Sequence, residues 1–274
     1  MAEFETGTDD LLVHTEGRVA VLTFNRPEAR NALTPSMYEG FARVLPALAG
    51  SSEVGAVMLT GAGSAFCAGG DVKAMATRRA PGASGAPSLE ERIDDLRLRQ
   101  ETVSLALHEL PKPVVGAIPG PAAGAGLSIA LACDVRIMAD NAFLTTAFAN
   151  VGFSGDFGGS WFLSQLVGTA VARELYFTAR RVNADDALRL GLTNRVASAE
   201  NFAEEAMAFA QQLAAGPPIA HRLMKENLNR ALHHELKEAL AAEAVAMMRT
   251  GQTDDHREAA QAFVEKRSPV FKGR

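Results

Sequence analysis

Two patterns of hydrophobic and polar positions alternate along the first 200 residues of this chain. Short apolar runs that end at glycine or proline are typical of buried strands, and they occur at 56–61, 113–120 and 134–139. The stretch 11–25 reads as two strands joined at a glycine turn. Segments with helical spacing separate these runs. The pattern predicts an α/β fold in which short strands recur with helices as covers.

One helix is predicted directly after the second strand. Thr34 can cap its N-terminus, and Pro35 suits the first turn. One face then carries the apolar residues Met37, Phe41, Val44, Leu45 and Leu48. Pro46 is expected to kink or end the regular helix because proline lacks the N–H donor.

The pattern changes near residue 201, where strands disappear. Four helical segments follow, over 201–215, 218–234, 235–250 and 254–268. We therefore divide the chain into a core, 1–200, and a C-terminal helical region, 201–274, of the kind that mediates oligomerisation. The segment 76–90, rich in alanine, glycine, serine and proline, is expected to be a mobile loop.

Composition narrows the class of protein. The chain has 274 residues, of which 47% are hydrophobic and 22% charged, an ordinary globular balance. Its formal net charge of −5 argues against a nucleic-acid partner. No apolar run approaches the length of a membrane helix, and the acidic N-terminus has no signal-peptide pattern. With Cys67 and Cys133 as its two cysteines, the chain is expected to be a cytoplasmic protein.

Two glycine-rich segments, 59–75 and 117–134, follow predicted strands, but neither has the spacing of a dinucleotide or phosphate loop. No pair of histidines has zinc-binding spacing, so no metal site is expected. The segments instead offer backbone N–H donors at Gly69–Gly70 and at 124–126, where a helix begins. Two such donors aimed at one carbonyl oxygen form an oxyanion hole. Composition alone leaves open the alternative that these glycines only make tight turns.

A third glycine-rich segment, SGDFGGSW at 154–161, contains one carboxylate, Asp156. Apolar neighbours such as Phe157 and Trp161 would raise its pKa and improve it as a base. The alternative is that Asp156 caps the following helix or belongs to a turn.

Five motifs in order give the chain a family resemblance. They are NRPEARNAL (25–33), AFCAGGDVKAM (65–75), GPAAGAGLSIALACDVRIMAD (120–140), ANVGFSGDFGGSWFLSQLVG (149–168) and ADDALRLGLTNRV (184–196). The chain resembles the enoyl-CoA hydratase/isomerase (crotonase) family over nearly its whole length. The resemblance implies a spiral core of repeated ββα turns and C-terminal helices that build a homotrimer or a dimer of trimers.

The resemblance also implies acyl-CoA thioester substrates, with the thioester enolate stabilised by the backbone N–H groups of Gly70 and Ala125. No separate cofactor is implied, because coenzyme A is part of the substrate. Residues that match coenzyme A-contacting positions are Arg26, Ala29, Arg30, Ala68, Asp71, Val72, Phe271 and Lys272, the last two often acting across a subunit boundary. Substrate-pocket positions are Met75, Gly124, Ser128, Phe148, Gly152 and Trp161, although Trp161 is also expected in the core.

Two departures from the hydratase pattern decide between activities. Family hydratases hold water with two glutamates, and this chain has Ser128 and Phe148 at those positions. Asp156 aligns with the acidic residue of family isomerases, so the favoured activity is double-bond isomerisation of an enoyl-CoA with Asp156 as the proton shuttle. The alternatives are an enoyl-CoA hydratase of fatty-acid β-oxidation that uses Asp156 and Ser128, and a non-catalytic acyl-CoA binder. The six histidines show no clustering along the sequence, and Cys67 has no histidine partner, so neither is expected to be catalytic.

Overall fold

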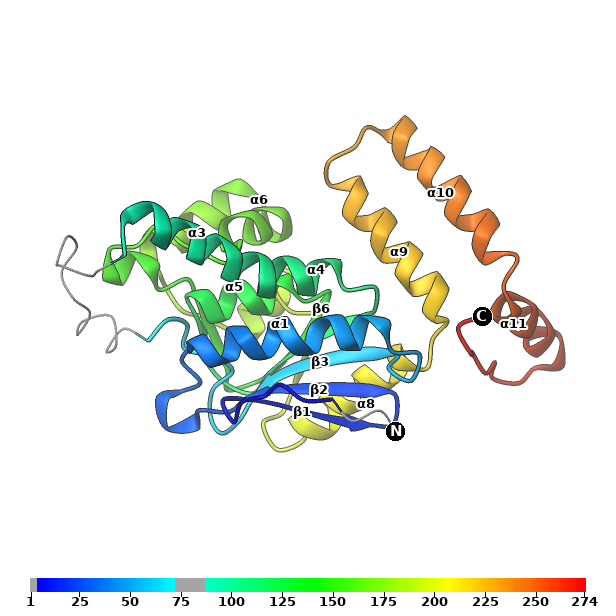
Figure 1. Ribbon diagram of the computed structural model, residues 1–274, viewed down its shortest axis with the longest axis horizontal. Coiled ribbons are helices and arrows are strands. Elements are labelled where there is room, and N and C mark those ends of the chain that lie inside the picture. The colour runs from blue at the N-terminus through cyan, green and yellow to red at the C-terminus, as the bar shows by residue number, and fades with distance from the viewer. Residues whose placement is uncertain (1–3, 72–86) are drawn as a thin grey trace.

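The computed structural model describes residues 4–71 and 87–274 (Figure 1). The sequence-based predictions for Val72 and Met75, and for most of the loop 76–90, lie outside the described residues. Helix α3 already begins at Leu89, with Ser88 and Glu91 forming a capping box, so the predicted loop is shorter than expected at its C-terminal end.

A six-stranded sheet forms the centre of the core, in the order β1-β2-β3-β4-β6-β9. Its strands are β1 (Leu11–Glu16), β2 (Val19–Phe24), β3 (Ala56–Gly61), β4 (Val114–Ile118), β6 (Val135–Ala139) and β9 (Arg195–Ala197). The β1–β2 pair is antiparallel, and the remaining neighbours run parallel. Every strand predicted from an apolar run is therefore present. Parallel strands that are covered on both faces need such continuous apolar sequences.

A second sheet has three short strands, β5 (Ala122–Ala123), β7 (Phe143–Thr145) and β8 (Val182–Asn183), in that order. An isolated parallel bridge joins Cys67 to Ala122 at the start of β5. This bridge places the two glycine-rich segments against each other.

Helices cover both faces of the large sheet (Figure 1). The helices of the core are α1 (Pro35–Gly50), α3 (Leu89–Gln100), the π-helical segment η2 (Glu101–Leu105), α4 (Ala106–Glu109), α5 (Ala125–Ala132), α6 (Gly159–Thr178), α7 (Ala184–Arg189) and α8 (Phe202–Ala214). Two short 3-10 segments, η1 (Pro27–Ala29) and η3 (Phe148–Val151), lie in the connections. All eight residues of α5 are buried, which suits a helix that is apolar on every side.

Helix α1 confirms the predicted start and the predicted buried face. The Thr34 hydroxyl accepts the N–H of Met37 at 3.3 Å, and each apolar residue named for that face is buried. The expectation that Pro46 would end the helix is wrong, because α1 continues to Gly50. Leu45 and Leu48 are almost fully buried on either side of Pro46, so core packing outweighs the single lost hydrogen bond.

The four predicted C-terminal helices are confirmed as α8, α9 (Pro218–Ala231), α10 (Leu236–Thr250) and α11 (Asp254–Glu265). Helix α8 packs against β2, β3 and β6 beneath the sheet, so packing does not break at residue 201. Helices α9 and α10 form an antiparallel hairpin, the C-terminal arm, with α10 on its outer side (Figure 1). Among the described residues, no helix is both long enough and apolar enough to cross a membrane.

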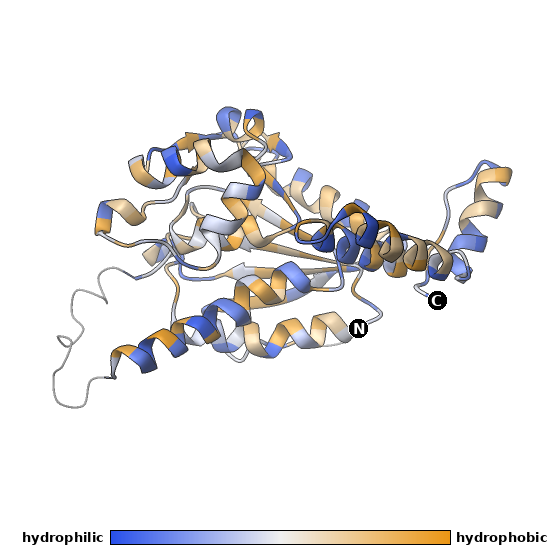
Figure 2. Ribbon diagram, turned by 90° about the horizontal axis from the view of Figure 1, so that it is seen from above, coloured by the Kyte–Doolittle hydropathy of each residue, from blue (hydrophilic) through white to orange (hydrophobic). Residues whose placement is uncertain are grey.

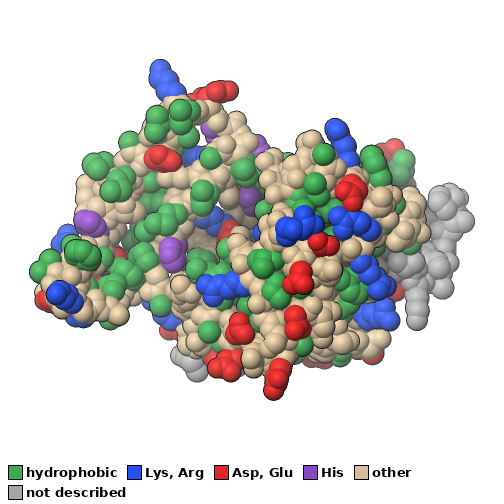
Figure 3. All heavy atoms as spheres, turned by 180° about the vertical axis from the view of Figure 1, so that it is seen from behind, with side chains coloured by type: hydrophobic (Ala, Val, Ile, Leu, Met, Phe, Trp, Pro, Cys, Tyr) green, Lys and Arg blue, Asp and Glu red, His purple; other side chains and the backbone are tan. Residues whose placement is uncertain are grey.

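Hydrophobic residues lie along both helices of the C-terminal arm and along α11 (Figures 2 and 3). The largely exposed apolar side chains there are Met224, Leu228, Leu236, Leu240, Val245, Met247, Met248, Phe263 and Val264. An apolar surface of this extent is typical of an interaction site.

Candidate active site

Two glycine turns from distant parts of the chain meet at the start of α5. The N–H of Ala123 donates to the Cys67 carbonyl at 2.9 Å. Gly69, at φ +85°, approaches so closely that a Cβ atom there would lie 2.7 Å from the Ala123 carbonyl oxygen and 3.1 Å from the Ala125 nitrogen. The first turn therefore needs glycine at position 69, and the contact brings the predicted donors Gly70 and Ala125 onto neighbouring turns.

The amides of Gly70 and Ala125 have the properties of free donors. Within residues 4–71 and 87–274, neither N–H donates a hydrogen bond to another residue. Ala125 is the first residue of α5, where backbone N–H groups lack intrahelical acceptors and the helix dipole is positive. Two such donors can receive the negative oxygen of a thioester enolate.

Ser128 and Phe148 lie beside this turn. Ser128 is one turn into α5, is 1% exposed, and donates to the Gly124 carbonyl at 3.3 Å. The Phe148 ring packs close to Gly124: a Cβ atom at Gly124 would lie 3.7 Å from the ring, an ordinary van der Waals contact. The structure thus brings together a hydroxyl and an aromatic ring, neither of which ionises to a base at neutral pH.

Asp156 lies in the loop that leads into α6. Burial raises the pKa of its carboxyl group to about 6, from 3.8. Its Oδ1 atom is buried and has no hydrogen-bond partner among the described residues. The interpretation of Asp156 as a helix cap is wrong, because the N-cap of α6 is Gly158 and no side chain caps the helix. A half-buried carboxyl group with one unpartnered oxygen and a pKa of about 6 can act as a proton acceptor near neutral pH.

Tyr176 is a neighbour of Asp156 that the sequence did not reveal. A Cβ atom at Gly159 would lie 2.3 Å from the Ser128 Oγ and 2.7 Å from the Tyr176 hydroxyl, so both hydroxyls converge on one point. Burial, and then the charge of Asp156, raise the pKa of Tyr176 to about 12. Tyr176 therefore remains a protonated donor. Its ring stacks on that of Phe148, with the ring centroids 5.9 Å apart.

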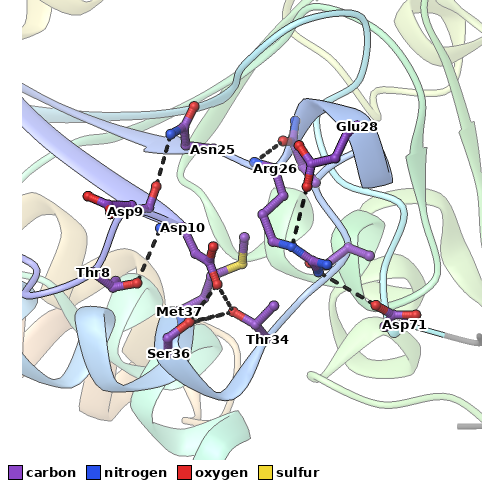
Figure 4. Close-up of polar contacts among 12 residues, drawn as sticks. Thr8, Asp9, Asp10, Asn25, Arg26, Glu28, Thr34, Ser36, Met37 and Asp71 are labelled. Atoms are coloured by element: carbon purple, nitrogen blue, oxygen red, sulfur yellow. Dashed lines mark hydrogen bonds and ion pairs between the residues drawn. The ribbon is translucent and has the colours of Figure 1, made fainter. Parts of the chain in front are cut away.

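The two segments expected to contact coenzyme A are fastened together by a buried asparagine. Asn31 donates to the carbonyls of Ala62 and Ala65, at 2.9 and 2.8 Å, and accepts the N–H of Arg26 at 2.9 Å. Arg26 lies 3.6 Å from the carboxylate of Asp71 (Figure 4). Asn31 is a site residue that the motifs did not single out; its backbone has φ 58°, a left-handed conformation that asparagine tolerates well.

The remaining positions of these motifs lie close by. Arg30 adopts a left-handed conformation, with φ 50°, and its carbonyl accepts the N–H of Ala68 at 2.9 Å. Ala29 ends the 3-10 segment η1 between Arg26 and Arg30. Gly152, a predicted substrate-pocket position of another motif, follows η3 and is exposed, with φ 71°. The structure therefore places Ala29, Arg30 and Ala68 with Arg26 and Asp71.

Phe271 and Lys272 lie elsewhere in the chain. The N–H of Lys272 donates to the buried Asp255 at 2.6 Å, and the Phe271 carbonyl accepts from Arg18 at 3.2 Å. Arg18 precedes strand β2 and Arg26 follows it, so about 20 Å of strand separates the two ends. Within one chain, these tail residues are not brought to the first motif.

Trp161 is both a core and a cavity residue. It is half-buried, packs against the hydrophobic core, and lines a cavity of about 580 Å³ between α3, α6 and α9. Its ring contacts His108 at a centroid distance of 5.4 Å and His233 at 5.7 Å. The two histidines, which show no clustering along the sequence, thus lie on the same tryptophan, one from α4 and one from the turn after α9. Among the described residues, no three metal-ligating side chains form a group.

Cys67 has the properties of an inert thiol. It is fully buried, and burial raises its pKa to about 12. A nucleophilic cysteine needs a lowered pKa and access. The expectation that Cys67 is not a nucleophile is therefore confirmed on both counts.

Comparisons with known proteins agree with this geometry. A family model described as enoyl-CoA hydratase/isomerase matches residues 14–274. A short-chain-enoyl-CoA hydratase of Clostridium acetobutylicum is 36% identical over 260 residues, covering 94% of this chain and 96% of its own. A 1,2-epoxyphenylacetyl-CoA isomerase of Escherichia coli is 34% identical over 264 residues, covering 96% and 98%.

A solved structure shows the same fold. The crystal structure of an enoyl-CoA hydratase from Polaromonas has a TM-score of 0.88 and 36% identity, and the match covers 95% of this chain and 99% of that one. The ββα order of the core, the meeting of the two glycine turns and these matches over nearly the whole chain lead to one conclusion. The chain is a member of the enoyl-CoA hydratase/isomerase family and has the crotonase fold.

Proposed function

We propose that this enzyme moves a carbon–carbon double bond within an enoyl-CoA thioester, with Asp156 carrying the proton. The observation that supports this most is the state of Asp156, a half-buried carboxyl group with a buried, unpartnered Oδ1 atom and a pKa of about 6. A group that titrates near the working pH is suited to both accept and return a proton.

The reaction needs two proton transfers and no other reactant. The Asp156 carboxylate removes a proton from the carbon next to the thioester of a 3-enoyl-CoA. The electron pair delocalises onto the thioester oxygen, where the N–H groups of Gly70 and Ala125 stabilise the negative charge. The protonated Asp156 then returns the proton two carbons further along, which leaves the conjugated 2-enoyl-CoA. No cofactor enters this cycle, because coenzyme A belongs to the substrate.

The second candidate, hydration, is supported by the names of relatives such as the Clostridium hydratase. Its water would be handled by Asp156 and Ser128. The pair of carboxylates that orients and activates water is lacking at positions 128 and 148, where Phe148 adds an apolar ring. The Escherichia coli relative is named as an isomerase of an epoxide thioester, so it supports isomerisation as a reaction class and not the double-bond shift in particular.

Recognition of coenzyme A is assigned to the paired motifs that Asn31 joins. Arg26, Arg30 and the backbone at Ala68 are proposed to contact the nucleotide and pantetheine. Phe271 and Lys272 would reach a coenzyme A molecule only from a neighbouring subunit, since their own chain holds them beyond the far end of β2.

The test is a pair of assays on the purified protein. With 3-enoyl-CoA, formation of the conjugated thioester without water addition is expected, and hydration of crotonyl-CoA is expected to be much slower. Fast hydration with no isomerisation would establish the second candidate instead. Tight binding of acetyl-CoA or octanoyl-CoA with no turnover of either substrate would identify a non-catalytic acyl-CoA binder.

The rate of isomerisation is expected to depend on pH through Asp156. The carboxylate form is the base, and burial raises its pKa to about 6, so kcat/KM for 3-enoyl-CoA should fall as the pH drops below about 6. The expected slope is about tenfold per pH unit on the acid side. A profile that stays flat down to pH 4.5, with the fold intact by circular dichroism, would exclude Asp156 as the base.

We also propose that the protein assembles as a homotrimer or a dimer of trimers through the exposed apolar faces of the C-terminal arm and α11. Such faces are buried in closed symmetric assemblies. Light scattering should give three or six times the 29.0 kDa mass of one chain. A replacement of Leu228 and Leu240 by lysine should lower that mass, and a wild-type monomer at micromolar concentration would contradict the proposal.

A further inference from the structure

One side chain packs against the loop that carries Asp156 on both sides of that residue. Gly155 precedes Asp156, and Gly159, the first residue of α6, follows it. A Cβ atom at Gly155 would lie 2.9 Å from Cε1 of Tyr176 and 3.1 Å from its hydroxyl oxygen. A Cβ atom at Gly159 would lie 2.7 Å from the same oxygen. The Tyr176 side chain therefore covers the loop from one glycine to the other.

The two glycines are needed for this close approach. Alanine at either position would collide with the tyrosine, and Gly155 also has φ 110°, which other residues rarely adopt. Helix α5 presents the neutral hydroxyl of Ser128 at Gly159 as well, where a Cβ atom would lie 2.3 Å from its oxygen. The backbone on either side of the carboxylate is thus shaped to receive a ring.

Tyr176 also connects this loop to the turn that carries an oxyanion donor. Its ring stacks on that of Phe148, with the centroids 5.9 Å apart and an interplanar angle of 19°. The Phe148 ring in turn packs against Gly124, the residue before Ala125. The stacked pair therefore lies between the proposed base, Asp156, and one of the donors that would stabilise the enolate.

Two hydrogen bonds fix the part of α6 from which Tyr176 projects. The Thr146 hydroxyl donates to the Leu175 carbonyl at 2.8 Å, and the Thr145 hydroxyl donates to the Ala179 carbonyl at 2.9 Å. Both threonines lie at the end of β7. The ring is therefore held from behind by the small sheet, and it can hold the loop in front of it.

The surroundings of Asp156 make burial the decisive influence on its carboxyl group. Burial raises the pKa of Asp156 to about 6, and no charge of the described residues contributes to that shift. The negative charge of Asp156 adds to the effect of burial in raising the pKa of Tyr176. The two side chains are therefore close enough to interact, and the tyrosine is a neutral neighbour.

Charged groups do face the loop from its other side. Tyr38 of α1 stacks on Phe157 with centroids 5.8 Å apart, and the Arg99 guanidinium of α3 lies 5.1 Å from the Tyr38 ring centre. Arg99 pairs with Asp95 at 2.6 Å. The titratable groups that line the cavity beside Phe157 are Arg97, Glu101, His108, Glu109, Arg230 and the His233–His234 pair. Because none of them shifts the pKa of Asp156, exclusion of water is what a neighbouring side chain can change.

We propose that Tyr176 is a positioning residue for the reaction: its ring holds the loop that carries Asp156 and keeps water from the carboxyl group. Without the ring, water would solvate the carboxylate, and a better solvated carboxylate is a weaker base. The ring carries this role, and the hydroxyl is not needed for it. The inference rests on the proposed isomerase function and adds a residue that acts through Asp156.

The first test is the pH profile of kcat/KM for 3-enoyl-CoA. In Tyr176→Ala the acid limb, expected near pH 6 in wild type, should move down by about one pH unit. Its kcat should fall about tenfold with KM within about twofold of wild type. Tyr176→Phe keeps the ring and should retain the wild-type limb, and its rates should stay within about twofold. Phe177→Ala, at a side chain of α6 that is 78% exposed, is the matched control and should behave as wild type.

The second test does not depend on activity. Asp156→Asn should stabilise the folded chain at pH 8, because it removes a charge that burial disfavours. In the Tyr176→Ala background the carboxylate is already hydrated, so the same substitution should stabilise by about half as much in urea unfolding. If Tyr176→Ala does not fold, Tyr176→Val, which lacks the ring atoms that contact both glycines, replaces it in both tests.

Three results would overturn the inference. They are an acid limb that stays near pH 6 when the ring is removed, a limb that moves as far in Tyr176→Phe, and an equal effect of Asp156→Asn in both backgrounds. Each of them leaves the isomerase proposal standing. A wild-type enzyme that does not isomerise 3-enoyl-CoA would instead remove the proposed function, and the unfolding comparison would still decide whether Tyr176 shields Asp156.

Discussion

Asp156→Asn is expected to lower the rate of 3-enoyl-CoA isomerisation by about 10²-fold or more, with little change in coenzyme A thioester affinity. The amide keeps the shape of the side chain but cannot take the proton. Because the Gly70 and Ala125 donors and the Asn31-linked motifs are untouched, binding should persist. The measurements are initial rates of conjugated-thioester formation and calorimetry with octanoyl-CoA.

The same variant should be more stable than wild type at pH 8. The unfolded chain loses the Asp156 proton near pH 3.8, whereas the folded chain keeps it up to about pH 6. Wild-type stability therefore falls as the pH rises between these values, and the deficit remains above pH 6. Removing the buried charge should raise the free energy of unfolding by about 1–2 kcal/mol, discounted for partial exposure.

The matched control is Asp185→Asn, at an exposed aspartate of α7. It should change neither the isomerisation rate nor, beyond about 0.5 kcal/mol, the stability. An Asp156→Asn enzyme that isomerises at the wild-type rate would rule out Asp156 as the proton shuttle, whatever its effect on unfolding.

Gly126→Ala is expected to reduce isomerisation by 10²-fold or more, on the order of the loss of one oxyanion donor. A Cβ atom at Gly126 would lie 2.3 Å from the Cys67 carbonyl oxygen and 2.8 Å from its carbon, both of which are backbone atoms. The start of α5 must therefore move away from the turn that carries Gly70. The two donors separate, and one oxygen can no longer receive both.

This variant should also unfold more easily, by roughly 1–3 kcal/mol, as overpacked cores do. Gly50→Ala serves as the control, because a Cβ atom there meets nothing within 4 Å at the end of α1. Kinetics should be read on protein shown to be folded by circular dichroism. If folded Gly126→Ala retains full kcat, the contact between the two glycine turns is not needed for catalysis.

The elements of the fold could be predicted wherever one pattern dominated locally. Strands β3 and β4 are continuous apolar runs, and such runs have few alternatives to burial. The start of α3 was missed even though Ser88 and Glu91 form a recognisable capping box, because the preceding low-complexity stretch dominated the interpretation. Pro46 led to the opposite error. Its local effect predicted that the helix could end there, but core packing keeps α1 helical to Gly50.

The candidate site could be predicted in part, for a different reason. Asp156 and the two glycine turns lie in short sequence motifs, so the neighbouring residues of each motif identify them. Tyr176 lies 20 positions beyond Asp156 on the far part of α6, and His233 comes from the turn that follows α9. No local spacing links such residues. Only the packing of α6 and α9 against the core brings them to the same region.

Asn31 has a consequence for how this protein can be altered. One side chain, 0% exposed, bonds to backbone atoms of both motifs assigned to coenzyme A. Neither segment can be exchanged for a foreign one while the other stays, because the incoming backbone would have to offer the same carbonyls at the same positions. The two motifs must therefore be exchanged together. A chimaera between family members should transfer residues 26–71 as one segment.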